Sequence, residues 1–446
     1  MEHALKTATL ICIAASCLFT ACDSDLGLSA STYTVGGMVT GLTGSSLVLQ
    51  YVAGANVAGT LTISSNGSFA FAPHVANGTT YSITVQSQPV NPTQTCTVSN
   101  GSGTLAGSDV TDVIVNCGGQ TAQFAYVANK LSNNLSAYTV NSSGSLTPVA
   151  GSPFVSTGSQ PDAVWVGPGG NFLYVANSAS NDLSIFSIGT GTGVLNPLST
   201  VPTGVAPYGI VVDPTGSYLY VSNYSSNDVS AYAVNSSSGA LAEISGSPFP
   251  VGVAPTSLKT DPSGQFLFVA NSGGSSVSVL RIDSSTGALS EVSGSPFAAG
   301  NGPISVAVDP SGAFAYVANA AAATISAYSI DSSSGALTAV ASPLGTQSSP
   351  TSLAFAGGSL IATDVTQANN VGTFAIAGTG ALSFTGMTPT GSAPVALAVG
   401  PTGQFAYVAC QGTNNVYIYT VNGGALTPAA PAFVSAGTGP VAIAID

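Results

Sequence analysis

The sequence predicts an all-β protein, a seven-bladed β-propeller with four-stranded blades that follows a small β-sandwich. Three features of the 446 residues predict this fold. Short alternating segments separated by turns rich in Gly, Pro, Asn and Ser run through most of the chain, as in all-β domains. From residue 123 the sequence repeats itself about every 46 residues, a period typical of propeller blades. The chain ends on a single further copy of the strand that opens each repeat, which predicts a closed ring.

Residues 1–22 have the pattern of a secretion signal. Lys6 precedes a mostly apolar run, Ala8 to Phe19, which is too short for a transmembrane helix and typical of a signal peptide. The run leads into Leu18-Phe19-Thr20-Ala21-Cys22, which is similar to a bacterial lipobox, where the cysteine becomes lipidated. Cys17 is a second candidate, and an ordinary cleaved signal is the alternative. A lipidated Cys22 predicts an extracytoplasmic protein anchored to the cell envelope, in the periplasm or at the cell surface.

Charged side chains are scarce in this sequence. They make up 5% of the residues, and 17 acidic residues outnumber 4 basic ones, which gives a net charge of −13. With so few cations to neutralise phosphates, nucleic acid is not expected as a partner. The acidic residues are scattered, so the sequence predicts no metal site, and it predicts no cofactor.

A Ser-rich tether over residues 23–32 precedes a small domain over residues 33–118. Alternating segments typical of strands cover residues 33–35, 46–49, 59–63, 68–71 and 81–85. Asn66-Gly67 and Asn77-Gly78 predict hairpin turns between some of them. Strands of this length and spacing predict a small β-sandwich, with a role as a spacer or in presentation. His74, the only histidine after the leader, has no second candidate ligand near it and is interpreted as a loop residue.

Four cysteines follow the leader if cleavage leaves Cys22 at the new end of the chain. Cys96 and Cys117 flank a Gly- and Ser-rich region and are predicted to form a disulfide in an oxidising compartment. Cys410 is left over. A nucleophilic cysteine needs a base beside it, and the repeat region has no histidine, so Cys410 is interpreted as a small buried strand residue.

The repeats over residues 123–446 each open on a proline. These prolines are Pro161, Pro207, Pro255, Pro303, Pro350, Pro394 and Pro440. In the unit that opens at Pro303, four strands are predicted at 304–308, 313–318, 324–330 and 336–340. Asp309-Pro310-Ser311-Gly312 predicts a type I turn between the first two, in which the aspartate has a structural role. The closing segment, 440–446, supplies the opening strand that the first repeat lacks, and six complete units plus this shared one make seven blades.

The repeat region resembles a known family. The combination of Val-Ala-Val-Asp-Pro-Ser-Gly, Tyr-Val-Ala-Asn and Gly-Ser-Pro-Phe, as at 306–312, 316–319 and 294–297, is similar to the cycloisomerase-2, or 6-phosphogluconolactonase-like, propeller lactonases. Tyr-Val-Ala-Asn also resembles the YVTN repeats of surface proteins. The resemblance implies a seven-bladed propeller, and for active members a site of His, Glu and Arg on one face.

Those catalytic residue types cannot be carried over to this sequence. The repeat region has no histidine, and its only arginine is Arg281, on a predicted third strand away from the hub. Glu243 and Glu291 fall on outer strands. We therefore expect a non-catalytic binding or scaffolding propeller. A lactonase with a non-standard site and a structural protein similar to surface-layer proteins are the alternatives.

Two sets of residues are candidates for a site. Lys259 is the one charged residue at a position of the innermost strands that otherwise holds Trp165, Val211, Ala307, Ala354, Ala398 and Ala444. It is a candidate base or Schiff-base nucleophile, or alternatively a solvated lysine at the channel mouth. Amides and aromatic rings on one face predict a neutral carbohydrate or peptide ligand, unless the asparagines only serve loop geometry. The residues concerned are Asn129, Asn177, Tyr208, Asn223, Tyr224, Asn227 and Asn319.

Overall fold

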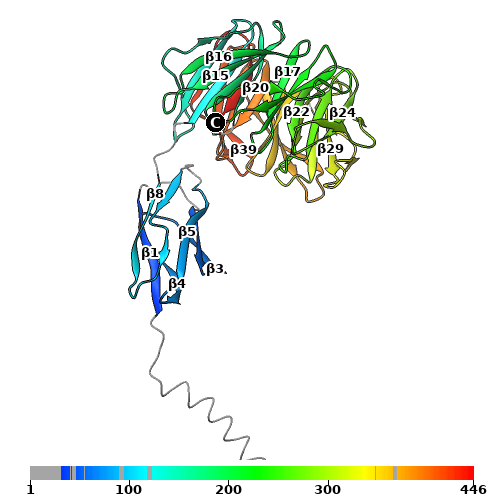
Figure 1. The fold of residues 1–446 in the computed structure, drawn as a ribbon. Coiled ribbons are helices and arrows are strands. Elements are labelled where there is room, and N and C mark those ends of the chain that lie inside the picture. Colours follow the sequence, from blue (N-terminus) through cyan, green and yellow to red (C-terminus); the bar gives the residue numbers. More distant parts are fainter. Residues whose placement is uncertain are drawn as a thin grey trace, which may run out of the picture. The chain divides into compact units, whose positions relative to one another are not determined.

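The computed structural model describes residues 32–40, 42, 47–54, 56–89, 95–117, 123–167, 169–346, 348–364 and 369–446, and Figure 1 shows them as strands joined by turns and loops. The chain divides into two compact units, residues 1–121 and 122–446. The predicted leader with Cys22, and the tether up to residue 31, lie outside the described residues. In the described part of the chain, no helix has the length and apolar character needed to cross a membrane.

The first unit is a small β-sandwich of two four-stranded sheets, as predicted. One sheet has the order β4-β1-β8-β6 and contains β1 (Thr32–Thr40), β4 (Gly67–Ala76), β6 (Cys96–Ser99) and β8 (Val110–Cys117). The other has the order β3-β2-β5-β7 and contains β2 (Leu47–Ala53), β3 (Asn56–Ile63), β5 (Thr80–Ser87) and β7 (Ser102–Thr104). Alternate side chains of both sheets, among them Tyr51, Phe71 and Val113, are buried in one shared core.

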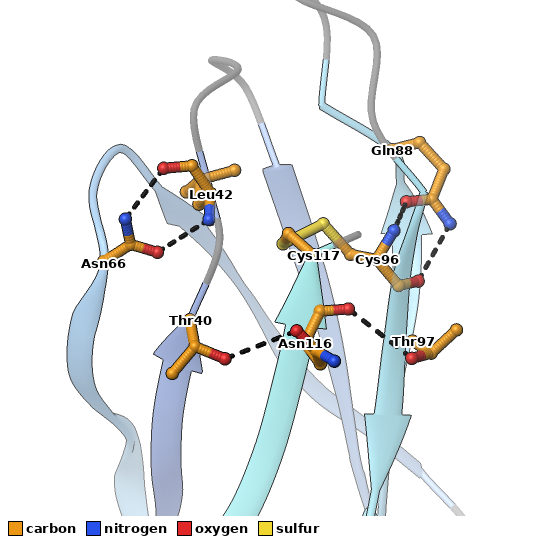
Figure 2. Close-up of a disulfide and its surroundings, with 8 residues drawn as sticks. All are labelled: Thr40, Leu42, Asn66, Gln88, Cys96, Thr97, Asn116 and Cys117. Atoms are coloured by element: carbon orange, nitrogen blue, oxygen red, sulfur yellow. Dashed lines mark hydrogen bonds between the residues drawn. A yellow bond between two sulfur atoms is a disulfide. The ribbon is translucent and has the colours of Figure 1, made fainter. Parts of the chain in front are cut away.

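The two Asn-Gly turns of this unit do not form hairpins, so that prediction is wrong. β3 pairs with β2, β4 pairs with β1, and β5 pairs with β2, so each turn carries the chain from one sheet to the other. The side chain of Asn66 instead bonds both backbone groups of Leu42, at 2.7 and 2.8 Å, as Figure 2 shows. The Asn66 amide thus holds the segment in which the chain crosses from one sheet to the other, and it is not part of a tight hairpin turn.

The predicted disulfide between Cys96 and Cys117 is present. The two cysteines are directly opposite each other on β6 and β8, and both are buried (Figure 2). The side chain of Gln88 bonds the backbone N–H of Cys96 at 2.8 Å and its carbonyl at 3.2 Å, which holds this end of β6 in place. A crosslink across a loop of this size stabilises the fold by about 3 kcal/mol in the chain-entropy model.

The second unit is the predicted seven-bladed β-propeller. The first blade combines β40 (Pro440–Ile445) with β9 (Gln123–Asn129), β10 (Asn134–Val140) and β11 (Leu146–Pro148). The second blade contains β13 (Pro161–Val166), β14 (Phe172–Asn177), β15 (Asp182–Ile188) and β16 (Leu195–Pro202). The third contains β17 (Pro207–Val212), β18 (Tyr218–Asn223), β19 (Asp228–Val234) and β20 (Leu241–Glu243). The fourth contains β22 (Pro255–Thr260), β23 (Phe266–Asn271), β24 (Ser276–Ile282) and β25 (Leu289–Glu291).

Three further blades complete the ring. The fifth contains β27 (Pro303–Val308), β28 (Phe314–Asn319), β29 (Thr324–Ile330) and β30 (Leu337–Ala339). The sixth contains β32 (Pro350–Ala356), β33 (Ser359–Asp364), β34 (Asn370–Ile376) and β35 (Leu382–Pro389). The seventh contains β36 (Pro394–Val399), β37 (Phe405–Cys410), β38 (Asn415–Asn422) and β39 (Ala425–Ser435). Every innermost strand thus begins at one of the prolines identified in the sequence.

The ring closes as predicted, by pairing the last strand with the first. β40 runs antiparallel to β9, with Ile443 opposite Val127 and Ala444 opposite Tyr126. Closure in this way removes the two free sheet edges that the chain ends would otherwise expose.

Four blades carry a short additional strand that the sequence did not predict. The four strands are β12 (Phe154–Val155), β21 (Phe249–Pro250), β26 (Phe297–Ala298) and β31 (Leu344–Gly345), and each pairs with the third strand of its blade. Three of them begin at the phenylalanine of a Gly-Ser-Pro-Phe motif. This motif therefore brings the chain back to the third strand of its own blade before the chain crosses to the next blade.

Candidate functional site

A central channel of about 660 Å³ runs between the innermost strands of the propeller. Seven residues share the Lys259 position of the innermost strands, which we call the ring position. Six of them line the channel, namely Trp165, Lys259, Ala307, Ala354, Ala398 and Ala444. Val211 does not, because its side chain is buried against the neighbouring blades. Each innermost strand is the free edge of its sheet, so its unpaired backbone groups also face the channel and favour a hydrated interior.

An ion pair lies at one mouth of the channel. Lys130 follows β9 in the first blade, and Asp162 is the second residue of β13 in the second blade. Their side chains are 2.7 Å apart and both line the channel. The Lys130 side chain is 28% exposed, whereas that of Asp162 is only 7% exposed. The pair therefore ties two neighbouring blades together and leaves the carboxylate little contact with solvent.

Two tyrosines lie at the same mouth. The rings of Tyr208 and Tyr224 have centroids 6.2 Å apart, and Tyr208 lines the channel whereas Tyr224 is exposed. Burial, with smaller contributions from Asp162 and Tyr224, raises the pKa of Tyr208 to about 12. Tyr208 is thus a neutral hydrogen-bonding group at physiological pH. Gln411, from the seventh blade, is a further polar side chain in the channel lining.

Four asparagines of the predicted face end second strands, and they do not present their amides to a ligand, which corrects that part of the prediction. Asn129, Asn177, Asn223 and Asn319 are fully buried. Each Nδ2 donates to groups on the third strand of its own blade, as when Asn223 bonds Asp228 at 2.6 Å and Ser230 at 2.9 Å. The amides therefore hold the second and third strands together inside each blade.

Asn227 also has a structural role. Its backbone is in the left-handed region, with φ of 61°, and its Oδ1 accepts the backbone N–H of Ala254 at 2.7 Å. Ala254 immediately precedes the opening proline of the next blade. The same bond recurs around the ring, where a backbone N–H donates to an asparagine Oδ1. The donors are Gln160, Ala206, Ala393 and Gly439, and their acceptors are Asn133, Asn181, Asn369 and Asn414 in the same order. The second interpretation of these asparagines, that they serve loop geometry, is the one that fits Asn227.

Lys259 lines the channel, is half-buried, and lies three residues further along its strand than Asp162 and Tyr208 lie along theirs. Its ammonium is 4.9 Å from the centre of the Trp165 ring, although the two residues belong to blades separated by a third one. Burial lowers the pKa of the Lys259 ammonium. Among the described residues the one ion pair is Lys130 with Asp162, so Lys259 has no acidic partner there. Asp261 is not such a partner, because its carboxylate bonds Ser263 and the backbone N–H of Phe266 within its turn.

The other chemically reactive residue types lie away from the channel. Arg281 donates to the carbonyl of Ser333 and lies 4.7 Å from the centre of the Phe266 ring, on an exposed part of β24. Glu243 and Glu291 are exposed on the outer strands β20 and β25. Cys410 is buried on β37 with its sulfur 3.3 Å from Thr390 Oγ1, and burial raises the pKa of its thiol. No cluster of metal-ligating side chains occurs in the described ranges.

Sequence reasoning missed two pairings. Lys130 and Asp162 belong to neighbouring blades, and no local pattern in the sequence indicates that their side chains meet. Trp165 and Lys259 share one position in the repeat, and this is a signal from which their meeting in the channel could have been found. Their contact depends on the channel being narrow enough for a lysine to reach past one intervening blade.

These features define a single-chain propeller whose central channel is large enough for a small ligand and holds little charge. The family model described as "Lactonase, 7-bladed beta-propeller" matches residues 61–255, 252–355 and 346–442, and the chain belongs to this family. The first match begins inside the β-sandwich rather than at the first blade. No curated protein sequence matches the chain.

Solved structures of related proteins share the propeller. A 6-phosphogluconolactonase candidate from Bacteroides uniformis is 20% identical with a TM-score of 0.65, covering 73% of this chain and 100% of its own. A second candidate from Bacteroides fragilis is 19% identical with a TM-score of 0.65, covering 73% and 98%. The periplasmic gluconolactonase PpgL of Pseudomonas aeruginosa is 20% identical with a TM-score of 0.63, covering 73% and 99%. At this level of identity the likeness establishes the fold alone.

Proposed function

We propose that the protein is an envelope-anchored member of the lactonase family whose propeller binds a small neutral carbohydrate at the channel mouth without hydrolysing a lactone. The binding groups are Tyr208 and Tyr224, whose rings offer apolar faces to a sugar, and Gln411, whose amide both donates and accepts. The Lys130–Asp162 pair supplies charged hydrogen-bonding groups to hydroxyls without adding net charge. A peptide is the other ligand class that such groups accommodate.

One observation carries the non-catalytic part of this proposal. Among the described residues, Asp162 is the only carboxylate that lines the channel, and Lys130 holds it at 2.7 Å while it is almost buried. Opening of a lactone needs a general base near the attacking water and a donor for the developing oxyanion. The Asp162 carboxylate is already bound to the Lys130 ammonium and is not free to take the proton of a water molecule. Among the described residues that line the channel there is no histidine, glutamate or arginine to replace it.

Lactone hydrolysis is the second candidate, and membership of the lactonase family favours it. In that case Asp162 would take the proton of a water molecule, and Lys130 or Lys259 would stabilise the oxyanion. Lactone turnover that disappears in the Asp162→Asn variant would select this candidate. Turnover that disappears in Lys259→Ala would give Lys259 the catalytic role for which the sequence made it a candidate.

The anchor and the location are part of the proposal. The lipobox-like segment ending at Cys22 supports lipidation, and the Cys96–Cys117 disulfide supports an oxidising compartment outside the cytoplasm. In a Cys22→Ala variant the protein is expected to move from the membrane fraction to the soluble fraction. If the variant stayed with the membrane, the anchor would have to lie elsewhere in the chain.

Binding at the mouth is tested with a glycan array and then by calorimetry with the best hit. The double variant Tyr208→Ala/Tyr224→Ala is expected to lose the signal. Tyr218→Ala, which removes a half-buried tyrosine outside the channel lining, on the second strand of the third blade, controls for the general effect of such a change. Absence of binding by the unaltered chain, or unchanged binding by the double variant, would refute the site at the mouth.

A further inference from the structure

The environment of Lys259 combines a cavity, a single positive charge and the absence of a counter-charge. Its ammonium projects into a channel of about 660 Å³, beside the ring of Trp165. Its aliphatic stem starts on β22 between the buried residues Leu258 and Thr260. Lys259 is half-buried in the channel wall, so its charge is only partly solvated, and the described residues supply no acidic partner for it.

The charges that line the channel add up to one positive charge. Lys130 and Asp162 cancel each other at the mouth, and Lys259 is the remaining charged group. A singly charged anion would neutralise the channel. A doubly charged phosphate monoester would leave it with a net negative charge, and a lysine offers a point charge rather than the fork of donors that arginine presents to phosphate.

The walls around Lys259 favour an organic anion of small cross-section. The same strand position holds Ala307, Ala354, Ala398 and Ala444 in four other blades, and Phe355 adds apolar surface beside Ala354. Short side chains leave room along the channel axis, and apolar surface favours a hydrocarbon body over a fully hydrated ion. The aromatic face of Trp165 keeps the ammonium in position while the site is empty of an anion.

We propose that the deep part of the channel is a binding site for a small organic monocarboxylate, with the carboxylate paired to the ammonium of Lys259 and the body lying along the alanine-lined walls. This site is separate from the carbohydrate site proposed at the mouth and does not depend on it. Because burial lowers the pKa of the free lysine, binding of a carboxylate is expected to reverse part of that change.

Trp165 provides the readout, since it is the only tryptophan of the chain and lies beside Lys259. The full chain without its leader is titrated with hexanoate, hexanamide and hexyl phosphate, which share one body and differ in head-group charge. Tryptophan fluorescence and calorimetry are followed together. Hexanoate is expected to bind at least about ten-fold more tightly than hexanamide, which corresponds to about 1.4 kcal/mol, and more tightly than hexyl phosphate.

Three variants separate a role of Lys259 from a general effect of charge. Lys259→Gln is expected to abolish the preference for hexanoate, and Lys259→Arg to retain most of it. Arg281→Gln removes the same charge from an exposed position outside the channel and is expected to leave the preference unchanged. Thermal unfolding of each variant checks that it is folded.

The proposal would be overturned by no binding of hexanoate, by equal binding of hexanoate and hexanamide, or by an unchanged preference in folded Lys259→Gln. Tighter binding of hexyl phosphate than of hexanoate would also overturn it, because the site would then be selective for a dianion. None of these results bears on the carbohydrate site at the mouth, which is tested through Tyr208 and Tyr224.

Discussion

Lys130 of the first blade and Asp162 of the second blade form an ion pair of 2.7 Å at the channel mouth, and the two partners differ in burial. The lysine retains contact with solvent, whereas the carboxylate is almost enclosed. Loss of the lysine would leave a nearly buried charge without a partner, but loss of the carboxylate would leave a lysine that water can solvate.

This asymmetry predicts unequal effects of the two single substitutions. Lys130→Met is expected to lower the free energy of unfolding by about 2–3 kcal/mol, and Asp162→Asn by about 1 kcal/mol or less. Denaturant unfolding of both variants, compared with the unaltered protein, gives the two values. Equal losses, or a larger loss for Asp162→Asn, would mean that the pair is better solvated than its geometry indicates.

Buried tyrosine hydroxyls join successive blades and give a second prediction. Tyr220 Oη donates to the carbonyl of Gly287 in the next blade at 3.0 Å, and four more tyrosines make the same bond at their own joints. Tyr220→Phe leaves that buried carbonyl unpaired and is expected to cost about 1–2 kcal/mol in the free energy of unfolding.

Tyr218→Phe is the matched control for this prediction. Its hydroxyl is exposed and makes a longer bond of 3.4 Å to Ser284, so the expected change is within about 0.5 kcal/mol. Chemical unfolding of the two variants under the same conditions compares them. If both variants lost the same stability, the hydroxyls would not be what joins the blades.

Much of the propeller could be predicted because the residues that begin its strands and form its turns recur at regular intervals. The seven prolines and the Asp-Pro turns fix the start of each innermost strand, and the final residues Pro440 to Ile445 reveal the closure directly. The sandwich was less predictable in detail, because Asn66-Gly67 is locally a hairpin signal and only the two sheets decide that the chain crosses there.

The site could be predicted only in part, for a physical reason. Blades are covered on both faces, so nearly every residue of a second strand is buried, and alternation no longer tells which side chains reach a ligand. Asn223 and Tyr224 are adjacent in sequence, yet one is fully buried and the other is exposed. The Lys259–Trp165 contact depends on the radius of the channel, and no local sequence pattern predicts that radius.

The closure of the ring predicts a dependence of stability on pH. Asp446 Oδ1 accepts the backbone N–H of Phe124 at 2.5 Å, and burial raises the pKa of this carboxyl from 3.8 to about 6. The folded state therefore holds a proton that the unfolded state has released between these two values. Stability from this group is complete below pH 3.8 and is lost as the pH rises through 6.

Asp446→Asn keeps the acceptor and removes the charge, so it is expected to stabilise the propeller at neutral pH. The gain is about 1–2 kcal/mol, or roughly 2–6 °C in Tm, because the side chain retains some contact with solvent that weakens the full effect. No gain is expected near pH 3.5. Thermal unfolding from pH 3.5 to 8 measures the difference, with Glu291→Gln as a control for the removal of one exposed charge. A constant gain at every pH would show that the titration of Asp446 is not its cause.

The most direct test of the central claim is the rate of lactone hydrolysis by the purified protein. With δ-gluconolactone and 6-phosphogluconolactone as substrates, and with proton release followed at constant pH, the ion-paired state of Asp162 predicts a rate equal to that of the uncatalysed reaction. A saturable rate above that background, abolished by Asp162→Asn in a variant that still folds, would contradict the account and establish the protein as a lactonase.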